Sequence, residues 1–222
     1  MSGKILQPPI GILGGTFDPV HIGHLRLALE AYERLNLSCV RLIPLNHPNH
    51  RATPTVSPEL RLEMLASSVD GKRLIADDRE LVRSGVSYTV ETLESLKRDY
   101  MHNPLCFLMG ADAFQNLCTW HRWDELLNSC HLIVVTRPDS ETPLEPRLED
   151  LVTRSEVTDP KRLASELCGR IFFLSIPLLP ISSTDIRIRI ESNRDISHLV
   201  PSSVQAIIQR HHFYQSPTSY ER

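Results

Sequence analysis

The residues with the clearest chemical potential lie near the N-terminus, in the stretch GILGGTFDPVHIGHL at positions 11–25. Two glycines, Gly14 and Gly15, end an apolar run, and two histidines, His21 and His24, follow where a helix is expected to begin. A spacing of three puts both imidazoles on one side of that helix. Free backbone N–H groups and the positive end of the helix dipole already favour an anion there. The pattern indicates two donors for a phosphate that gains charge in a transition state.

The glycines of this stretch fit neither of the common phosphate-binding fingerprints, since GxGxxG and GxxxxGK[ST] are both missing from it. Gly14 and Gly15 instead permit a close approach to the backbone or a positive φ directly after the strand. Asp18 and Pro19 then predict a turn. A lone histidine here would more often cap a turn or pack against the core, but two histidines beside a glycine turn favour the phosphate interpretation.

Short apolar runs alternate with amphipathic stretches along the rest of the chain. Several of these runs are apolar at consecutive positions, which is typical of strands buried on both faces. Strands alternating with helices predict a Rossmann-like α/β fold, a doubly wound parallel sheet in a single domain spanning 1–222, with a helical C-terminal part from about residue 182. The expected strands are 10–13, 40–45, 74–77, 105–109, 131–136 and 171–176, and the expected helices are 25–35, 59–69, 88–100, 111–117 with 124–127, and 202–211.

Two segments interrupt this alternation. Residues 44–58 hold four prolines and two histidines after the second expected strand, and a loop of that length in a compact domain is usually functional. Residues 137–150 are charged and rich in proline, and we interpret them as a solvated loop without an assigned role.

Composition narrows the choice of partner and compartment. The chain has 222 residues, with 24 basic and 27 acidic side chains and a net charge of −3, so it lacks the basic field expected of a nucleic-acid-binding protein. No apolar run is long enough to cross a bilayer, and no export signal is visible. The five cysteines form no CxxC pair, which predicts free thiols in a reducing cytoplasm. Cys118 and His121 alone do not make a metal site.

The motifs resemble a known family. GGTFDPVHIGH at 14–24 resembles the opening motif of the HxGH nucleotidyltransferases, within the nicotinate mononucleotide adenylyltransferase family of NAD biosynthesis. Five further blocks follow in the order of that family and extend the resemblance over nearly the whole chain: NHPNHR at 46–51, SYT at 87–89, GAD at 110–112 with Leu117 and Trp120, RP at 137–138 and ISSTDIR at 181–187. The resemblance implies an enzyme that joins ATP and nicotinate mononucleotide into deamido-NAD and releases pyrophosphate.

The same resemblance implies three groups of site residues and a cofactor. Mg²⁺ is expected to arrive on the phosphates of ATP, with no dedicated protein site. The expected catalytic residues are His21, His24 and Arg187. The expected ATP-binding residues are Gly14, Gly15, Thr16, Phe17, Gly110, Asp112, Arg137, Ser182 and Ser183. The expected mononucleotide-binding residues are Asn46, His50, Arg51, Ser87, Tyr88, Thr89, Trp120 and His121.

The segment 181–190 is ambiguous when taken locally. Ile186, Ile188 and Ile190 alternate with polar residues as in a strand, whereas Ser182 or Ser183 with Asp185 is typical of a helix cap. The resemblance favours the helix, with its N-terminus facing the β- and γ-phosphates.

Other functions stay open at this point. HIGH at 21–24 also occurs in class I aminoacyl-tRNA synthetases, but a KMSKS-like loop is missing and the net charge argues against tRNA. Nicotinamide mononucleotide or a phosphopantetheine-type acceptor are alternatives, although the SYT and LxxW blocks favour the nicotinate family. A non-catalytic nucleotide sensor on the same fold is a further alternative. The sequence does not distinguish the acid from the amide mononucleotide, and it leaves the oligomeric state open.

Overall fold

The computed structural model describes residues 6–46, 54–83, 85–137, 144–177 and 179–215. Six strands form one sheet in the order β3-β2-β1-β4-β5-β6, and every neighbouring pair is parallel. This confirms the predicted doubly wound α/β fold. The strands are β1 Ile10–Gly15, β2 Cys39–Pro44, β3 Leu74–Ala76, β4 Leu105–Gly110, β5 His131–Thr136 and β6 Ile171–Ser175.

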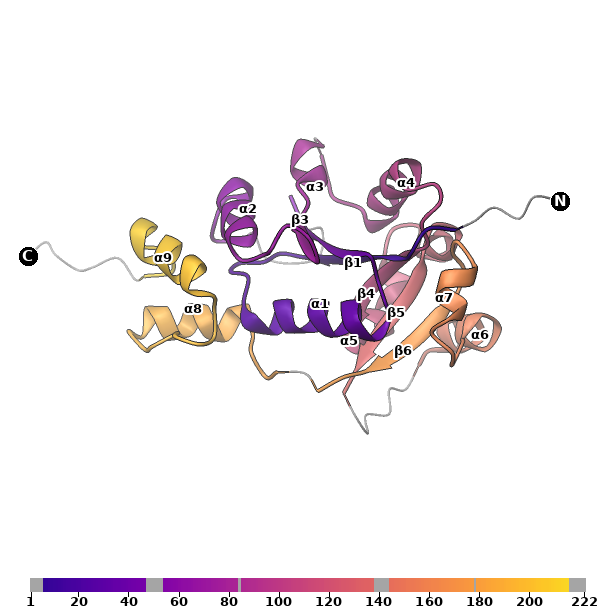
Figure 1. Cartoon of the computed structure of the whole chain (residues 1–222). Coiled ribbons are helices and arrows are strands. Elements are labelled where there is room, and N and C mark those ends of the chain that lie inside the picture. The colour runs from indigo at the N-terminus through magenta and orange to yellow at the C-terminus, as the bar shows by residue number, and fades with distance from the viewer. Residues whose placement is uncertain (1–5, 47–53, 84, 138–143, 178, 216–222) are drawn as a thin grey trace, which may run out of the picture.

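Helices flank this sheet and connect its strands (Figure 1). They are α1 Ile22–Arg34, α2 Pro58–Ser67, α3 Arg79–Val82, α4 Thr89–Asp99, α5 Ala111–Gln115, α6 Pro146–Ser155, α7 Arg162–Ser165, α8 Ser183–Glu191 and α9 Ser202–His211, with 3₁₀ turns at Leu117–Thr119 and Trp123–Asn128.

The sheet separates two hydrophobic cores. In β4, Cys106 and Leu108 belong to one core and Phe107 to the other, because successive side chains of a strand point to opposite faces. Helices α1, α2, α8 and α9 contribute to the first core, and α4, α5 and α6 contribute to the second. Burial on both faces explains the consecutive apolar residues of the central strands.

The strand order reverses between β1 and β4. The chain runs outward from β1 through β2 to β3 and then returns to add β4 on the other side of β1. A ligand of an open parallel sheet binds beyond the carboxyl ends of the strands at such a reversal. Figure 1 shows α8 and α9 at this end of β1, beside the start of α1.

The structure differs from the sequence prediction at two helices, and it resolves one segment that the sequence left ambiguous. Helix α1 begins at Ile22, three residues before the predicted start, because the histidine motif itself forms the cap. The ambiguous segment 181–190 is helical, as α8. The prediction of a loop over 137–150 is wrong for its last five residues, because α6 begins at Pro146 and buries Leu148. Proline suits the first turn of a helix, and one apolar face of this helix packs inward.

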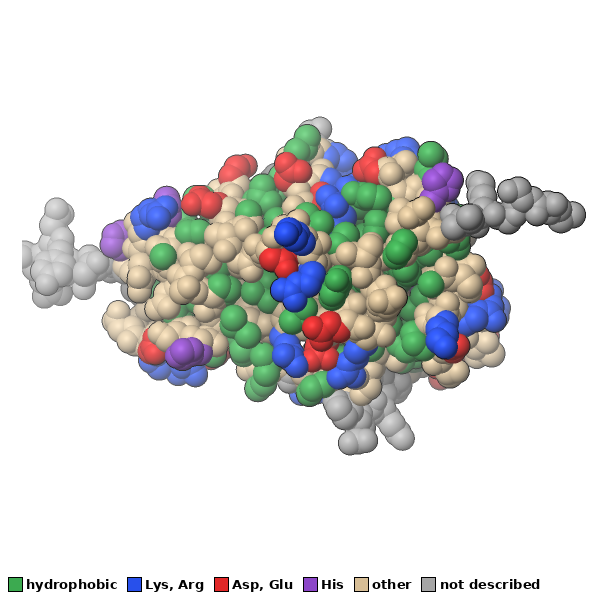
Figure 2. All heavy atoms as spheres, viewed as in Figure 1, with side chains coloured by type: hydrophobic (Ala, Val, Ile, Leu, Met, Phe, Trp, Pro, Cys, Tyr) green, Lys and Arg blue, Asp and Glu red, His purple; other side chains and the backbone are tan. Residues whose placement is uncertain are grey.

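The surface carries no dominant field of one sign on the face drawn in Figure 2, where acidic and basic side chains are interspersed. This agrees with the small net charge of −3. Within the described part of the chain, no helix is sufficiently long and apolar to span a bilayer.

Candidate active site

The turn after β1 leaves open space at the carboxyl edge of the sheet. At Gly14, which is exposed, an added Cβ atom would meet nothing nearer than the Phe107 ring at 3.8 Å. At Gly15, a Cβ atom would lie 3.0 Å from the ring of Phe17, so this ring would have to shift to admit a side chain there. The left-handed backbone falls on Phe17, with a φ of 50°, and on neither of these glycines. Of the two roles expected for Gly14 and Gly15, the structure excludes a positive φ, and a close approach to the backbone stays a prediction.

His21 and His24 together cap the start of α1. His21 is the N-cap residue, and its Nδ1 accepts a hydrogen bond from the backbone N–H of His24 at 3.4 Å. In return, Nδ1 of His24 accepts from the backbone N–H of His21 at 3.3 Å. The two rings are stacked with centroids 3.7 Å apart, and Phe17 meets the His24 ring edge-on at 4.9 Å. The spacing of three therefore brings the imidazoles together, as predicted.

These hydrogen bonds also determine where the ring protons lie. A ring nitrogen that accepts a hydrogen bond carries no proton, so the proton of each ring is on Nε2. His21 is only 5% exposed, and this burial lowers its pKa from 6.5 to about 4, so its ring is neutral at pH 7. The cap uses Nδ1 of each ring, so each ring carries its proton as an Nε2–H donor.

Gly23 lies closely packed against the ring of His21. A Cβ atom on Gly23 would lie 3.0 Å from Cε1 and Nδ1 of His21, and 3.6 Å from the carbonyl oxygen of Ile181. The His21 ring would therefore have to shift by a few tenths of an ångström to admit a side chain at this position. The glycine of the HxGH pattern thus gives the stacked histidines the room they occupy.

The N-terminus of α8 packs against the same turn. Ser182 caps α8, since its Oγ accepts a hydrogen bond from the backbone N–H of Asp185 at 3.1 Å. Ser183 Oγ donates to the carbonyl oxygen of Pro19 at 2.9 Å. Two helix N-termini, those of α1 and α8, therefore lie close together, and both favour an anion.

Arg187 is held on the histidine turn by its guanidinium. Nη1 donates to the carbonyl oxygen of Asp18 at 2.7 Å, and Nη2 donates to Thr184 Oγ1 at 3.2 Å. The structure thus brings the third predicted catalytic residue to the turn that carries the two histidines, although more than 160 positions separate them in the sequence.

Arg61 on α2 is a positioning residue that the sequence analysis missed. Its side chain is completely buried and donates to the backbone carbonyl oxygens of Val56 at 3.1 Å, Thr16 at 2.6 Å and Leu45 at 2.7 Å, with a longer bond to Asn46 at 3.4 Å. It therefore joins the turn after β1 to the loop after β2. An arginine inside an amphipathic helix pattern is normally interpreted as a surface residue. The acceptors of Arg61 are backbone carbonyl oxygens, so no side-chain signal in the sequence points to its burial.

The candidates after β4 and β5 reach the same edge of the sheet. Gly110 ends β4 and pairs with Val135 of β5, and Arg137 follows β5 in an exposed position. Asp112 is exposed in the first turn of α5. These positions suit contacts with a nucleoside, because they border the reversal of strand order beside β1.

The predicted mononucleotide residues come together in two contacts. The backbone N–H of Asn46 donates to Ser87 Oγ at 3.3 Å, which joins the loop after β2 to the SYT motif. The rings of Tyr88 and His121 lie with centroids 4.2 Å apart. Thr89 is the first residue of α4, and the N-terminus of α4 has no side-chain cap among the described residues.

Trp120 lies beside the second core rather than fully inside it. It is half-buried, and its ring meets the Phe107 ring at a steep angle, with centroids 6.2 Å apart. This arrangement agrees with a flat face available to a ligand. His50 and Arg51, the other two predicted mononucleotide residues, lie outside the described residues.

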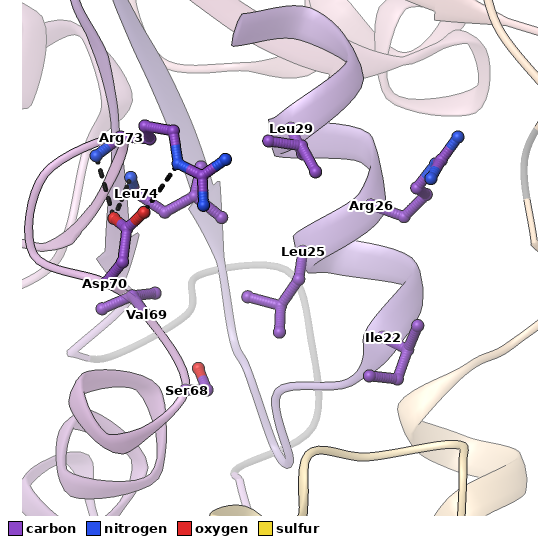
Figure 3. A pocket seen from close by; sticks show the side chains of 9 residues that line it. All are labelled: Ile22, Leu25, Arg26, Leu29, Ser68, Val69, Asp70, Arg73 and Leu74. Carbon is purple, nitrogen blue, oxygen red and sulfur yellow. Dashed lines mark hydrogen bonds and ion pairs between the residues drawn. The ribbon is translucent and has the colours of Figure 1, made fainter.

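A cavity of about 290 Å³ lies elsewhere, between α1 and the segment that joins α2 to β3 (Figure 3). Its walls include the apolar side chains of Leu25, Leu29 and Leu74. Two of its three charged lining residues, Asp70 and Arg73, are hydrogen-bonded to each other, with 2.8 Å between Arg73 Nε and Asp70 Oδ2, and the third is Arg26. No predicted site residue lines this cavity, so we assign the chemistry to the edge of the sheet.

Comparison with known proteins agrees with this geometry. The cytidylyltransferase-like family model matches residues 12–189. A relative from Methylococcus capsulatus is 43% identical over 92% of this chain and 99% of its own length, and one from Pseudomonas syringae pv. tomato is 45% identical over 95% of both chains; each is named probable nicotinate-nucleotide adenylyltransferase. The chain belongs to the nicotinate-nucleotide adenylyltransferase family.

Nicotinate-nucleotide adenylyltransferases of solved structure share its fold. A Plasmodium falciparum nicotinic acid mononucleotide adenylyltransferase complexed with NaAD superposes with a TM-score of 0.68 at 17% identity, covering 94% of this chain and 98% of that one. The same parasite enzyme complexed with APC gives a TM-score of 0.66 at 16% identity, over the same shares of the two chains. At these identities the likeness concerns the fold.

Proposed function

We propose that this chain transfers the adenylyl group of ATP to nicotinate mononucleotide, forming deamido-NAD and pyrophosphate. A phosphate oxygen of the mononucleotide attacks the α-phosphorus of ATP, the bond from that phosphorus to the bridging oxygen breaks, and pyrophosphate leaves. The nucleophile is already an anion, so the protein contributes mainly position and charge stabilisation. The observation that carries the proposal is the stacked pair His21 and His24 beyond β1, with Nδ1 of each ring engaged in the cap of α1.

The histidines are suited to the α-phosphate. Their Nδ1 atoms are engaged by the backbone, so the rings cannot rotate without loss of the cap. Donors held in this way lose little entropy when charge develops on the phosphate, and one such donor commonly contributes about 3 kcal/mol to the transition state. Phe17, against the His24 ring, further restricts that ring.

The α8 N-terminus and Arg187 are suited to the β- and γ-phosphates. A guanidinium carries five N–H groups, so the two hydrogen bonds that fix Arg187 leave it able to contact phosphate as well. Thr16 Oγ1 is buried and has no hydrogen-bond partner among the described residues, which supports a polar ligand beside Gly14 and Gly15. We assign the adenosine to the edge formed by Gly110, Asp112 and Arg137.

The α4 N-terminus supports the acid form of the mononucleotide. An uncapped helix start offers backbone N–H groups and positive potential, which favour the carboxylate of nicotinate over the neutral amide. Tyr88 and Thr89 lie at this helix start, and Trp120 is half-buried beside β4. We assign the pyridine ring to the space near Trp120 and His121, and the mononucleotide phosphate to the loop that begins at Asn46.

We assign Mg²⁺ to the triphosphate, where it would neutralise charge when ATP binds. Mg²⁺ is commonly bound through substrate phosphates and water rather than by a protein cage. The N–H groups described above would contact phosphate oxygens rather than the metal, so they fit a Mg²⁺ ion that ATP itself carries. We also assign the reaction to the cytoplasm, because all five cysteines are free thiols.

The experiment is a pyrophosphate-release assay with ATP and each mononucleotide. We expect release with nicotinate mononucleotide and a lower kcat/KM with the amide. His24→Ala should lower kcat by about 100-fold, whereas the exposed His102→Ala should leave it unchanged. A chain that binds ATP but releases no pyrophosphate with either acceptor would be a sensor, and a loss under threefold in His24→Ala would refute the role of that ring.

A further inference from the structure

Asp18 connects three distant parts of the chain at the histidine turn. Its side chain is almost fully buried, with the residue 4% exposed. Oδ1 accepts a hydrogen bond from the Tyr214 hydroxyl at 2.7 Å, and Oδ2 accepts from the backbone N–H of Thr55 at 2.8 Å. The carbonyl oxygen of Asp18 accepts from Arg187. A shift of Asp18 would therefore move the segment that holds both Arg187 and the start of α1.

Tyr214 reaches Asp18 from the C-terminal end of the described chain. It follows α9, which is attached to α2 by the bond from Ser203 Oγ to the carbonyl oxygen of Ser67 at 2.9 Å. Phe213 is tied back to α9 through its backbone N–H and the carbonyl oxygen of Ile208 at 3.1 Å. Both aromatic rings pack against the first core, so the approach of the phenol is fixed from two sides.

The backbone at Tyr214 is itself unusual. Its φ is 62°, and a bulky residue in the left-handed region is a conformational outlier that persists only where its surroundings determine it. A strained residue whose hydroxyl is bonded to a buried carboxylate beside the histidines points to a role at that turn. Burial and the Asp18 carboxylate together raise the pKa of Tyr214, so the phenol stays protonated and donates.

We propose that Tyr214 is a positioning residue for adenylyl transfer, acting through Asp18 to hold Arg187 and the histidine turn in register. This inference rests on the proposed function. Neither Tyr214 nor Asp18 needs to touch a substrate for this role. Because the bond holds the groups that meet the phosphates, its loss is expected to lower kcat while the KM for nicotinate mononucleotide stays nearly constant.

The test is Tyr214→Phe, which removes one hydroxyl and keeps the packing. We expect kcat to fall about tenfold, which corresponds to about 1.4 kcal/mol, with the KM for nicotinate mononucleotide within twofold of the wild type. Tyr32→Phe is the matched control, because Tyr32 is half-buried against the same core, and it should keep wild-type kcat. In Asp18→Ala, which removes the acceptor of the Tyr214 hydroxyl, adding Tyr214→Phe should cause no further loss if the phenol acts through Asp18.

Either of two results with the single variants would overturn the inference: wild-type kcat in Tyr214→Phe, or a fall in kcat that Tyr32→Phe shares. A fully additive double variant would also overturn it, since the phenol would then act independently of Asp18. If the wild type itself releases no pyrophosphate, the proposed function is wrong, and the imidazole NMR signals of His21 and His24 decide the inference. Tyr214→Phe should shift them, and unmoved signals would refute the positioning role.

Discussion

Replacing His21 with asparagine should change how the stability of the protein depends on pH. Asparagine is also a preferred N-cap residue, so His21→Asn keeps a side-chain cap on α1 while it removes the imidazole. In the wild type, burial holds the pKa of His21 at about 4 against 6.5 in the unfolded chain. The unfolded state therefore binds a proton more readily than the folded state, and the stability falls as the pH falls from 6.5 toward 4.

The size of this effect follows from the two pKa values. At pH 5, the unfolded histidine is almost fully protonated and the folded one is mostly neutral, and the linkage relation gives a cost of about 2 kcal/mol. At pH 7 the same relation gives a cost of about 0.2 kcal/mol. The free energy of unfolding of the wild type should thus drop by about 2 kcal/mol more than that of His21→Asn between pH 7 and pH 5.

The assay is urea unfolding of both proteins at pH 7 and pH 5, with linear extrapolation to zero denaturant. His131 is also buried with a lowered pKa, but it is present in both proteins and cancels in the difference. The exposed His102→Asn is the control, and it should follow the wild type. Parallel behaviour of wild type and His21→Asn would refute the reasoning, because His21 would then be able to gain a proton without leaving its folded position.

Two further variants test the supporting geometry. Gly23→Ala should lower kcat about tenfold or more, because the new methyl group would displace the His21 ring. Its free energy of unfolding, measured in urea, should change by less than about 1 kcal/mol, since the helix preference of alanine offsets the weakened cap. Wild-type kcat would contradict the steric explanation. Arg61→Met should lower the free energy of unfolding by about 3 kcal/mol or more, because buried carbonyl oxygens lose a charged donor. The exposed Arg210→Met should have little effect, and equal losses in both would argue against the role of Arg61.

The sheet was predictable because strands that are buried on both faces leave a recognisable apolar pattern in the sequence. Runs such as 131–136 are apolar at nearly every position, and parallel strands covered on both faces require that pattern. The short helices α3 and α7 were not predicted, since four residues show no period. Helix α6 could have been found: Pro146 at its start and Leu148, Leu151 and Val152 on one face are a helix pattern, but the surrounding prolines and charges suggested a loop.

From the residues alone, the candidate site was predictable only where its members are close together in the sequence. The family resemblance supplied the distant members, such as Arg187. His21 and His24 stand three apart, so their shared face could be inferred. The bonds that Arg61 makes to backbone carbonyl oxygens, and the bond between Tyr214 and Asp18, join segments that meet only after folding. Backbone acceptors leave no trace in a sequence, and a pair separated by 196 positions has no periodicity to detect.

The capping of α1 by His21 and His24 has a consequence for which residues evolution can place at this helix start. Serine, threonine, aspartate and asparagine are the favoured residues at a helix start, and histidine is not among them. A related chain without catalytic activity could therefore carry one of those residues at position 21 and have a more stable start of α1. If the proposed function is right, histidine at position 21 gives up some helix stability for a donor at the reacting phosphate, and we expect relatives that lack turnover to carry aspartate or serine there.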